Sequence, residues 1–282
     1  MESGKLYVVP TPIGNLKDIT LRALEVLEAS DIIAAEDTRQ SLKLLNHYNI
    51  KKPLVSYHKF NEQNKSGSLI EMLKDGRIVA LVSDAGSPGI SDPGSVIIKK
   101  CLEEGIPFEV LPGATAVITA LVYSGMDTDK FTFLGFFPRE TKDRKRLMED
   151  IRDREETMVI YEAPHRLLEA LSFIGDNLGN RQVAVCRELT KIHEEIFRGG
   201  ILEAIEHFAL KQIKGEIVLV IKGKSELEIK EEREKEWADL SVKDHILNYM
   251  KQGHSKKDSI KLVAAERGMP KSEVYRHSIE IE

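Results

Sequence analysis

Cysteine is scarce in this chain, and long apolar runs are missing. The two cysteines, Cys101 and Cys186, lie far apart, each among apolar neighbours and outside any metal-binding spacing. This pattern excludes a disulfide framework or a zinc finger and favours a reduced, intracellular protein. No stretch approaches the ~18 apolar residues that a membrane span needs, and the first five residues lack the apolar core of a signal peptide. We therefore expect a cytoplasmic protein with no membrane partner.

Neither sign of charge dominates the composition. Lys and Arg number 41 against 46 Asp and Glu, which gives a net charge of −5. The overall charge therefore does not indicate a nucleic-acid-binding protein, although local basic patches remain compatible with one. The length of 282 residues suffices for a sizeable core and about two domains.

Strand and helix patterns alternate along the first 125 residues. The run Ile78–Val82 is short, continuous and β-branched, as in a buried parallel strand. Further strands are expected at 6–9, 31–35, 53–56 and 108–111. Strands that alternate with helices predict an α/β fold with a doubly wound, mostly parallel sheet.

Composition changes divide the rest of the chain. A polar, turn-forming segment at 124–129 predicts a boundary after residue 125, and strands and helices then mix over 126–224. The segment 225–236 is nearly all charged, and three apolar helical stripes follow it. We expect an N-terminal α/β domain (1–125), a mixed α/β domain (126–224), and a charged linker with a helix-turn-helix-like tail (225–282).

Three loops follow predicted strands, at 10–15, 36–39 and 84–94, and in a parallel sheet they open on the same edge. None matches G-x-G-x-x-G or G-x-x-x-x-G-K-[ST], and prolines stand where phosphate-binding loops offer N–H donors. A compact ligand with a carboxylate and an adenosine is therefore favoured over a nucleotide polyphosphate. In the third loop, Asp92 reads as a helix N-cap and Pro93 as the first helical residue.

Five motifs, in order, resemble one family. They are Val9-Pro10-Thr11-Pro12-Ile13-Gly14-Asn15, Ala35-Glu36-Asp37-Thr38-Arg39, the loop 84–94, Leu111-Pro112-Gly113-Ala114-Thr115 and Tyr161-Glu162-Ala163-Pro164-His165-Arg166. This set resembles the tetrapyrrole-methylase superfamily of class III S-adenosylmethionine-dependent methyltransferases. Over residues 5 to 223 it resembles more narrowly the ribosomal RNA small subunit methyltransferase I family. That family methylates the ribose 2′-hydroxyl of a cytidine in small-subunit (16S) rRNA.

The resemblance implies a two-domain fold with S-adenosylmethionine in the cleft, and a homodimer that acts on small-subunit rRNA or the 30S particle. The second domain would close over the cofactor. The cofactor-binding residues that it implies are Pro10, Pro12, Gly14, Asp84, Ala85, Gly86, Pro88, Ala114, Thr115, Tyr161, Leu189 and Gly215. The first loop, Pro10 to Asn15, departs from the glycine-rich loop of relatives that act on tetrapyrroles, and this departure favours the RNA branch.

A ribose hydroxyl is weakly acidic and benefits from a base. The candidate bases are Glu36, Asp37, Glu162 and His165, and direct displacement assisted by positioning is the alternative. Asp37 with Gln40 also fits a capping box, which is a purely structural role. The basic residues expected to contact RNA phosphates are Arg39, Arg139, Arg144, Lys145, Arg166, Arg187, Lys256 and Lys257.

Two other functions stay open. One is a tetrapyrrole (porphyrinoid) methylase, which has the same fold and cofactor but needs a broad apolar cleft for its acceptor. The other is a non-catalytic rRNA-binding assembly factor whose basic tail carries the affinity. A charge run taken alone is most simply a solvated helix face.

Overall fold

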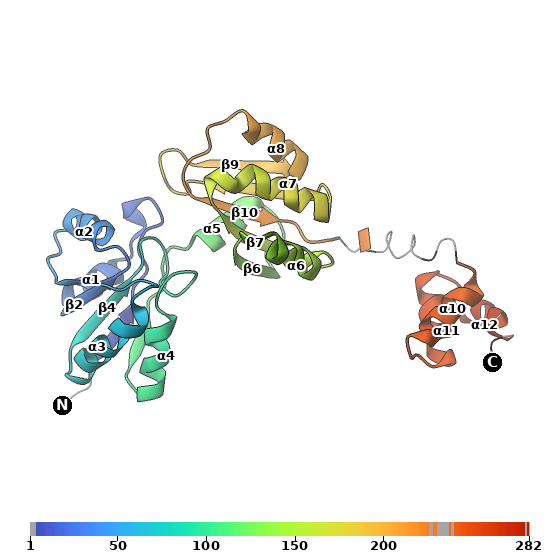
Figure 1. Ribbon diagram of the computed structural model, residues 1–282, viewed down its shortest axis with the longest axis horizontal. Coiled ribbons are helices and arrows are strands. Elements are labelled where there is room, and N and C mark those ends of the chain that lie inside the picture. Colours follow the sequence, from blue (N-terminus) through green and yellow to red (C-terminus); the bar gives the residue numbers. More distant parts are fainter. Residues whose placement is uncertain (1–3, 226–227, 230–236, 238–239, 280, 282) are drawn as a thin grey trace. The chain divides into compact units, whose positions relative to one another are not determined.

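The computed structural model describes residues 4–225, 228–229, 237, 240–279 and 281. Chain contacts divide it into two compact units. The first comprises Met1–Glu149 and Glu156–Lys222, and the second comprises Asp150–Glu155 and Gly223–Glu282. The first unit contains both β-sheets and the second contains the C-terminal helices (Figure 1). No helix in the described part of the chain is long and apolar enough to cross a membrane.

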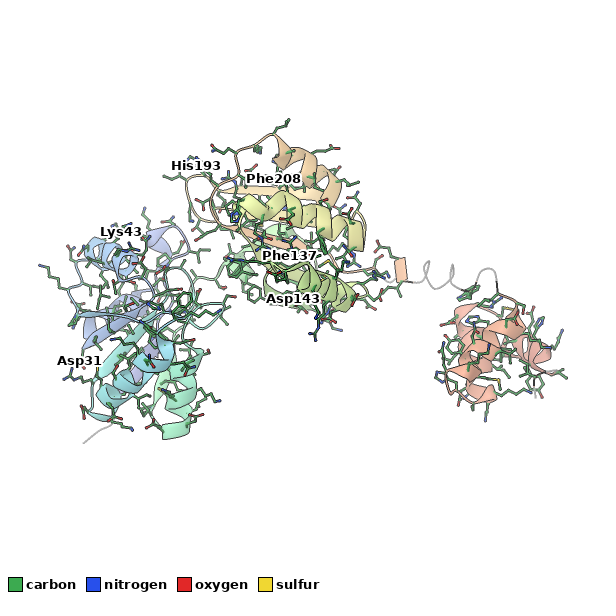
Figure 2. The ribbon with its side chains drawn as sticks, in the orientation of Figure 1. Asp31, Lys43, Phe137, Asp143, His193 and Phe208 are labelled. Carbon is green, nitrogen blue, oxygen red and sulfur yellow. The ribbon has the colours of Figure 1, made fainter. Side chains whose placement is uncertain are left out.

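The first sheet is entirely parallel, with the strand order β3-β2-β4-β1-β5. Its strands are β1 (Lys5–Val8), β2 (Ile32–Ala35), β3 (Leu54–Ser56), β4 (Ile78–Val82) and β5 (Phe108–Val110). Asp31, which is labelled in Figure 2, precedes β2. Its carboxylate accepts a hydrogen bond of 2.7 Å from the N–H of Ile78, and this bond aligns the amino-terminal ends of β2 and β4. The prediction of a doubly wound, mostly parallel sheet is confirmed.

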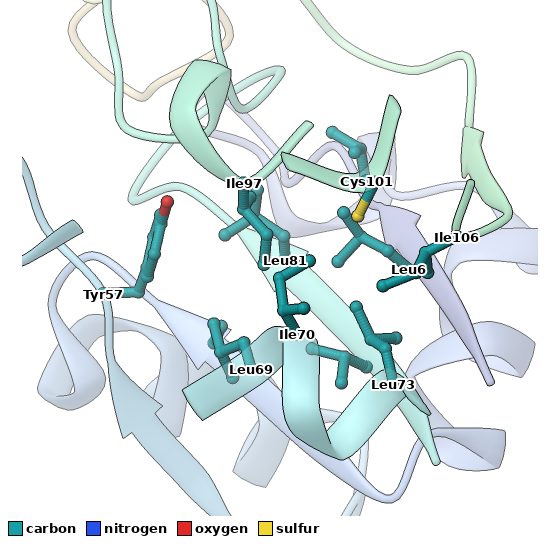
Figure 3. Close-up of a cluster of buried hydrophobic side chains, with 12 residues drawn as sticks. Leu6, Tyr57, Leu69, Ile70, Leu73, Leu81, Ile97, Cys101 and Ile106 are labelled. Carbon is teal, nitrogen blue, oxygen red and sulfur yellow. The ribbon is translucent and has the colours of Figure 1, made fainter. Parts of the chain in front are cut away.

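Strand β4 is central because apolar side chains cover both of its faces. Val79 and Leu81 pack with helices α3 and α4, whereas Ala80 and Val82 pack with α1 and α2. These helices are α1 (Leu21–Ala29), α2 (Thr38–His47), α3 (Glu62–Lys74) and α4 (Ser95–Glu104). Figure 3 shows the α3–α4 side of this core, where Ile70 of α3 and Ile97 of α4 lie beside Leu81. Two buried faces explain the continuous apolar run in this strand.

The second sheet is mixed, with the order β6-β7-β10-β8-β9. Its strands are β6 (Phe131–Phe136), β7 (Thr157–Glu162), β8 (Gln182–Arg187), β9 (Glu195–Gly200) and β10 (Ile217–Ile221). Only the β6–β7 pair is parallel among these ladders. Helix α5 (Ala116–Ser124) follows β5 in the chain but packs on β8 and β10, and so it joins the two sheets of this unit.

Three further helices and two short 3₁₀ turns complete the described part of the first unit. They are α6 (Thr141–Ile151), α7 (Leu167–Leu178), α8 (Ile201–Ala209), η1 (Leu16–Asp18) and η2 (Pro164–Arg166). The sequence did not predict α8, whose apolar side chains Ile201, Ala204 and Phe208 are buried against the sheet and α7.

The prediction for the start of α4 is wrong. The helix begins at Ser95, and Gly94 rather than Asp92 occupies the N-cap, with φ of 147°. The chain turns sharply over the end of β4 at this point: a Cβ on Gly94 would lie 3.1 Å from Leu81 Cδ2 and 3.2 Å from the Gly89 nitrogen. The helix therefore begins two residues later than predicted, and the Asp92 carboxylate is left available for another role.

The second unit contains the three helices expected in the tail: α10 (Val242–Lys251), α11 (Lys256–Glu266) and α12 (Lys271–Ser278). Ile246, Val263 and Val274, one from each helix, are fully buried together. Residues 226–227 and 230–236 of the predicted charged linker lie outside the described residues. The helix-turn-helix likeness stays a prediction, although Gly268 lies in the short turn between α11 and α12 with φ of 60°.

Candidate functional site

A cavity of about 370 Å³ lies within the first unit, at the carboxyl ends of β4 and β7 and the start of β10. Its volume is that of a small-molecule site. The lining residues are Ile13, Asp84, Ala85, Gly86, Ser87, Ile90, Asp92, Thr115, Ala116, Phe136, Tyr161, Glu162, Ala163, Pro164, Gly215, Glu216, Ile217 and Val218. Because both sheets contribute, loops far apart in sequence meet at one cavity.

The first loop contributes Ile13 to the cavity lining and is bonded to the third loop. Thr11 and Gly86 exchange two backbone hydrogen bonds of 2.9 and 3.0 Å, and the buried Thr11 hydroxyl donates to the carbonyl of Ser83. The two loops meet because β1 and β4 are neighbours in the sheet. Gly86 has φ of 78°, a conformation that glycine adopts at little cost. This loop therefore holds the 84–88 backbone in place.

Carboxylates gather on one side of the cavity. Asp84, Asp92 and Glu216 line it, and Glu36 at the end of β2 is close enough to interact electrostatically with Asp84 and Asp92. Burial, followed by the charges of Glu36, Asp84 and Glu216, raises the pKa of Asp92 to about 7. Burial and the charge of Asp84 also raise the pKa of Glu36. Such a set of acids favours a bound cation. Among the described residues, no group of His, Cys, Asp and Glu has the arrangement of a metal site.

The N-terminus of helix α5, which has a partial positive charge, lies at the same cavity. Thr115 is its N-cap, and its side chain makes no capping hydrogen bond. The first N–H groups of a helix attract negative charge. The cavity thus combines an acidic side with a helix N-terminus, and this pairing suits a zwitterionic ligand.

Aromatic and apolar side chains form the remaining wall. The Tyr161 ring packs edge-on against Phe133 and Phe136, with centroid distances of 4.9 and 5.3 Å. Burial and the charge of Asp92 raise the pKa of Tyr161 to about 12, so that it stays a neutral phenol. Ile217 and Val218 continue this wall. A flat heterocycle fits such a surface.

Gly215 closes the cavity beside the 188–191 loop. A Cβ at Gly215 would lie 2.3 Å from the Glu188 carboxylate. That carboxylate accepts hydrogen bonds from the N–H of Glu216 at 3.0 Å and from Nζ of Lys191 at 2.8 Å. Glu188 and Thr190 both have positive φ, so this loop is held in a strained conformation.

The structure brings half of the predicted cofactor residues to the cavity wall: Asp84, Ala85, Gly86, Thr115, Tyr161 and Gly215. The others, Pro10, Pro12, Gly14, Pro88, Ala114 and Leu189, lie outside the lining. Ala114 and Leu189 pack with Ile13 in a hydrophobic cluster, and Gly14 lies against Thr190 and Lys191. Ala114 and Leu189 therefore support Ile13, which lines the cavity.

Several lining residues escaped the sequence prediction. Asp92 belongs to the loop 84–94, but the sequence analysis assigned it to a helix cap. Glu216 matches no motif, and only its position next to Gly215 could have indicated it. Phe136 lies in a strand whose alternation says nothing about which face meets a ligand.

The four predicted bases have very different surroundings. Asp37 caps α2 through the N–H of Arg39 and pairs with the Arg39 guanidinium at 2.6 Å, and these contacts hold the pKa of Asp37 at about 2. The reciprocal half of the predicted capping box does not form, since the Gln40 side chain accepts from Lys43 instead. Asp37 therefore has the structural capping role that the sequence also allowed, and a carboxyl with so low a pKa is a weak base.

Glu162 and His165 differ in exposure. Glu162 is buried, and its Oε1 accepts from the N–H of Ala163 at 2.7 Å and lies 3.5 Å from Arg166. Burial raises the pKa of Glu162 despite the nearby Arg166. His165 is exposed and does not line the cavity. Glu36 is half-buried and stands behind Asp84.

The basic residues predicted to contact RNA separate by exposure. Arg39, Arg139, Lys145 and Lys257 are exposed. Arg166 donates to the carbonyls of Phe137 and Pro138, Arg187 to Glu195 and the Lys214 carbonyl, and Lys256 to the Ile281 carbonyl. Asp143 on α6 points away from the sheet (Figure 2). It accompanies the exposed cations of that helix.

The RNA-binding prediction for Arg144 is contradicted. Its side chain is 8% exposed, pairs with Glu169 at 2.5 Å and donates to the Pro138 carbonyl at 2.9 Å. The guanidinium also lies over the rings of Phe137 and Phe173. Helix periodicity turns this position inward while its neighbours face solvent, so Arg144 is a packing residue.

Known structures share this architecture. Residues 5–205 match the family Tetrapyrrole (Corrin/Porphyrin) Methylases. A crystal structure of diphthine synthase superposes with a TM-score of 0.65 at 15% identity, over 79% of this chain and 91% of that one. Uroporphyrin-III-C-methyltransferase from Thermus thermophilus gives a TM-score of 0.54 at 21% identity, over 78% and 92%. The fold and site thus define a methyltransferase of the tetrapyrrole methylase class.

Proteins related in sequence show to which family within this class the chain belongs. A protein from Bacillus subtilis named "Ribosomal RNA small subunit methyltransferase I" is 48% identical over 274 residues, which is 97% of this chain and 94% of the relative. A protein of the same name from Synechocystis is 42% identical over 99% of both chains. A third from Thermotoga maritima is 47% identical over 78% of this chain and 99% of its own. The chain belongs to the ribosomal RNA small subunit methyltransferase I family.

The cofactor of this class is S-adenosylmethionine, and the residues present fit it. Asp84 and Glu216, on the acidic side, suit its sulfonium and ammonium charges. The N-terminus of α5 suits its carboxylate. The wall of Tyr161, Ile217 and Val218 suits its adenine.

Proposed function

We propose that this chain methylates the 2′-hydroxyl of a cytidine ribose in small-subunit rRNA, with S-adenosylmethionine as methyl donor. The observation that carries the proposal is the similarity over nearly the whole chain to relatives named for small-subunit rRNA, joined to a cavity with an acidic side and an aromatic wall. The small-subunit rRNA or the 30S particle is the proposed partner, and the cytoplasm is the proposed location.

The bound cofactor supplies a methyl group that is already activated by the sulfonium charge. The task of the chain is therefore to position the acceptor and to manage charge and water. Asp84 and Glu216 balance positive charge in the cavity, while Phe136, Ile217 and Val218 exclude water. The paired loops that contain Thr11 and Gly86 keep this geometry rigid before the substrate arrives.

The exposed cations are the proposed contacts to RNA phosphates. Arg39 is the best placed, since its side chain is 86% exposed and it lies near enough to Asp84 to affect the pKa of that carboxyl. Arg139 and Lys145 are further exposed cations on and beside α6, and Lys257 is an exposed cation of the second unit. Exposed guanidinium and ammonium groups can bind RNA phosphates locally, even though the net charge of the whole protein is negative.

The C-terminal helices are proposed to add RNA affinity rather than chemistry. Every cavity residue lies between Ile13 and Val218, outside the second unit. The Thermotoga maritima relative matches over 99% of its own length but only 78% of this chain, so a relative of the same name has about a fifth less chain. A homodimer, which the family resemblance implies, is part of the proposal for the whole molecule.

Two measurements test the function. Calorimetry measures the affinity for S-adenosylmethionine, and transfer of a tritiated methyl group is then followed on small-subunit particles. Nuclease digestion and mass spectrometry of the labelled rRNA are expected to yield 2′-O-methylcytidine. A methylated base, or transfer to a porphyrinoid but not to rRNA, contradicts the proposal. Cofactor-independent RNA binding with no transfer identifies a non-catalytic assembly factor instead.

A further inference from the structure

We propose that Asp92 is the catalytic base: its carboxylate receives the proton of the ribose 2′-hydroxyl as that oxygen is methylated. This inference rests on the proposed function and adds a residue that the sequence had assigned to a helix cap. Asp92 lines the cavity on the loop after β4, together with Asp84, Glu216 and Tyr161.

Asp92 is the cavity acid whose charge is not engaged by another group. Asp84 accepts from the N–H of Asp37 at 2.9 Å, Glu216 pairs with Lys191 at 3.0 Å, and Glu162 accepts from the N–H of Ala163. In the described part of the chain, the Asp92 carboxylate has no hydrogen bond or ion pair of its own. A base must keep a lone pair available for its substrate, and Asp92 does so.

The surrounding backbone holds Asp92 in place. Gly89, Ser91 and Gly94 have φ values of 85°, 63° and 147°, and Pro93 follows Asp92 directly. A positive φ at Ser91 is unusual for a residue with a side chain, and such strain concentrates at functional sites. Proline fixes the next φ, and the close approach of Gly94 to Leu81 leaves the loop little freedom.

Titratable groups from four elements face Asp92. They are Glu36 after β2, Asp84 after β4, Glu216 before β10, and the Tyr161 hydroxyl on β7. With burial, the three carboxylates raise the pKa of Asp92 to about 7. General bases work best when their pKa lies near the operating pH, because they are then ionised and still basic. An ordinary exposed aspartate is too weak a base for this role.

The proposed step balances as follows. The hydroxyl oxygen forms a bond to the methyl carbon while the carbon–sulfur bond breaks, and the bonding pair stays on sulfur, which becomes a neutral thioether. The hydroxyl proton passes to Oδ of Asp92, which becomes a carboxylic acid. Asp92 returns this proton to water after the methylated ribose leaves.

The experiment compares Asp92→Asn, Asp92→Glu and Glu36→Gln with the wild-type protein, with Asp176→Asn on the exposed surface of α7 as control. Single-turnover methyl transfer to small-subunit particles is measured from pH 5.5 to 9.5, with calorimetric Kd values for S-adenosylmethionine. The Asp92 carboxyl is titrated separately by carbon-13 NMR in the cofactor-free protein. Thermal unfolding confirms that each variant is folded.

We expect Asp92→Asn to slow transfer by about 10²–10⁴-fold, the usual contribution of a general base, with the cofactor Kd changed less than about threefold. Asp92→Glu restores part of the rate. The NMR titration gives a pKa near 7 in the wild type. Glu36→Gln moves both that pKa and the inflection of the rate profile to lower pH, because it removes a neighbouring negative charge.

Three results overturn the inference. If Asp92→Asn transfers methyl as fast as the wild type, Asp92 is not the base, and the proposed function stands. If Asp92→Asn loses more than tenfold in cofactor affinity with an unchanged single-turnover rate at saturation, Asp92 is a counter-ion for the cofactor. If the wild type binds the cofactor but transfers nothing to rRNA, the proposed function fails and this inference fails with it.

Discussion

Replacing Asp92 with Asn is expected to stabilise the folded protein, and increasingly so at higher pH. The Asp92 carboxyl has a pKa of about 7 in the folded chain against an ordinary value of 3.8. The folded state therefore holds this proton more strongly than the unfolded state does. The free energy of unfolding falls as the pH rises from about 4 to 7, and above pH 7 the loss is complete.

The shift sets an upper limit of about 4 kcal/mol for this loss, at 1.36 kcal/mol per pKa unit. Because the carboxylate is only partly buried, solvent screening reduces the effect to about 1–2 kcal/mol. Asparagine keeps the shape and removes the charge. For a unit of this size that gain raises the melting temperature by about 3–6 °C at pH 8. At pH 5 about one third of the gain is expected, since the unfolded state is then ionised and the folded state is not.

Differential scanning calorimetry of the cofactor-free protein at pH 5 and pH 8, at low salt, measures this difference. Asp176→Asn on α7 is the matched control, because the same chemical change on an exposed surface shifts stability by less than about 0.5 kcal/mol. A destabilised Asp92→Asn variant would refute the reasoning, and so would a gain that is equal at the two pH values. Stability gained with activity lost is the expected trade-off of a charged active site.

Three further outcomes are expected. Arg144→Met loses about 1–3 kcal/mol of unfolding free energy in denaturant titrations without weakening RNA binding, because its side chain is buried against Glu169 and Pro138; weakened RNA binding at unchanged stability would contradict the burial. Gly215→Ala lowers the free energy of unfolding by about 1–3 kcal/mol and weakens cofactor binding, because the added Cβ collides with the Glu188 carboxylate. In the control Gly105→Ala, the added Cβ has open space and the only cost is backbone strain. Equal effects of the two alanines in calorimetry would refute the steric argument. A chain that ends at Ser225 keeps its cofactor Kd within about twofold but loses RNA affinity in salt-titrated binding assays; a large loss of cofactor affinity would place part of the site in the tail.

Local patterns in the sequence were sufficient for most strands and helices. The Ile78–Val82 run predicted a buried central strand, and apolar contacts on both of its faces explain why the pattern was continuous. The three apolar stripes of the tail likewise became three packed helices. Helix α8 was missed although Ile201, Ala204 and Phe208 recur at helical spacing, so the pattern was present in the sequence.

The start of α4 shows where local reasoning fails. Asp92 followed by Pro93 is a typical helix start, and nothing nearby in sequence argues against it. The close approach of Gly94 to Leu81 and Gly89 decides the matter, and this contact exists only after β4 is buried in the sheet. The same contact turns a predicted cap into an acid that lines the cavity.

Arg144 and Lys145 make the same point about charge. Both read as members of one basic run, but one side chain is buried beside Phe137 and the other is exposed. The composition of a helix gives the number of its cationic residues. Which of these residues can contact a phosphate depends on which face of the helix is packed against the rest of the protein.

The linear order of residues established the α/β class, the family motifs and the loops that surround the cavity, because these depend on short-range patterns of polarity and backbone restriction. The folded arrangement decided which side chains share the cavity. Asp92 acquires its raised pKa from Glu36, Asp84 and Glu216, and these acids lie in three separate segments that come together only when both sheets are formed. Burial and charge are properties of neighbours in space, so they appear only with the tertiary structure.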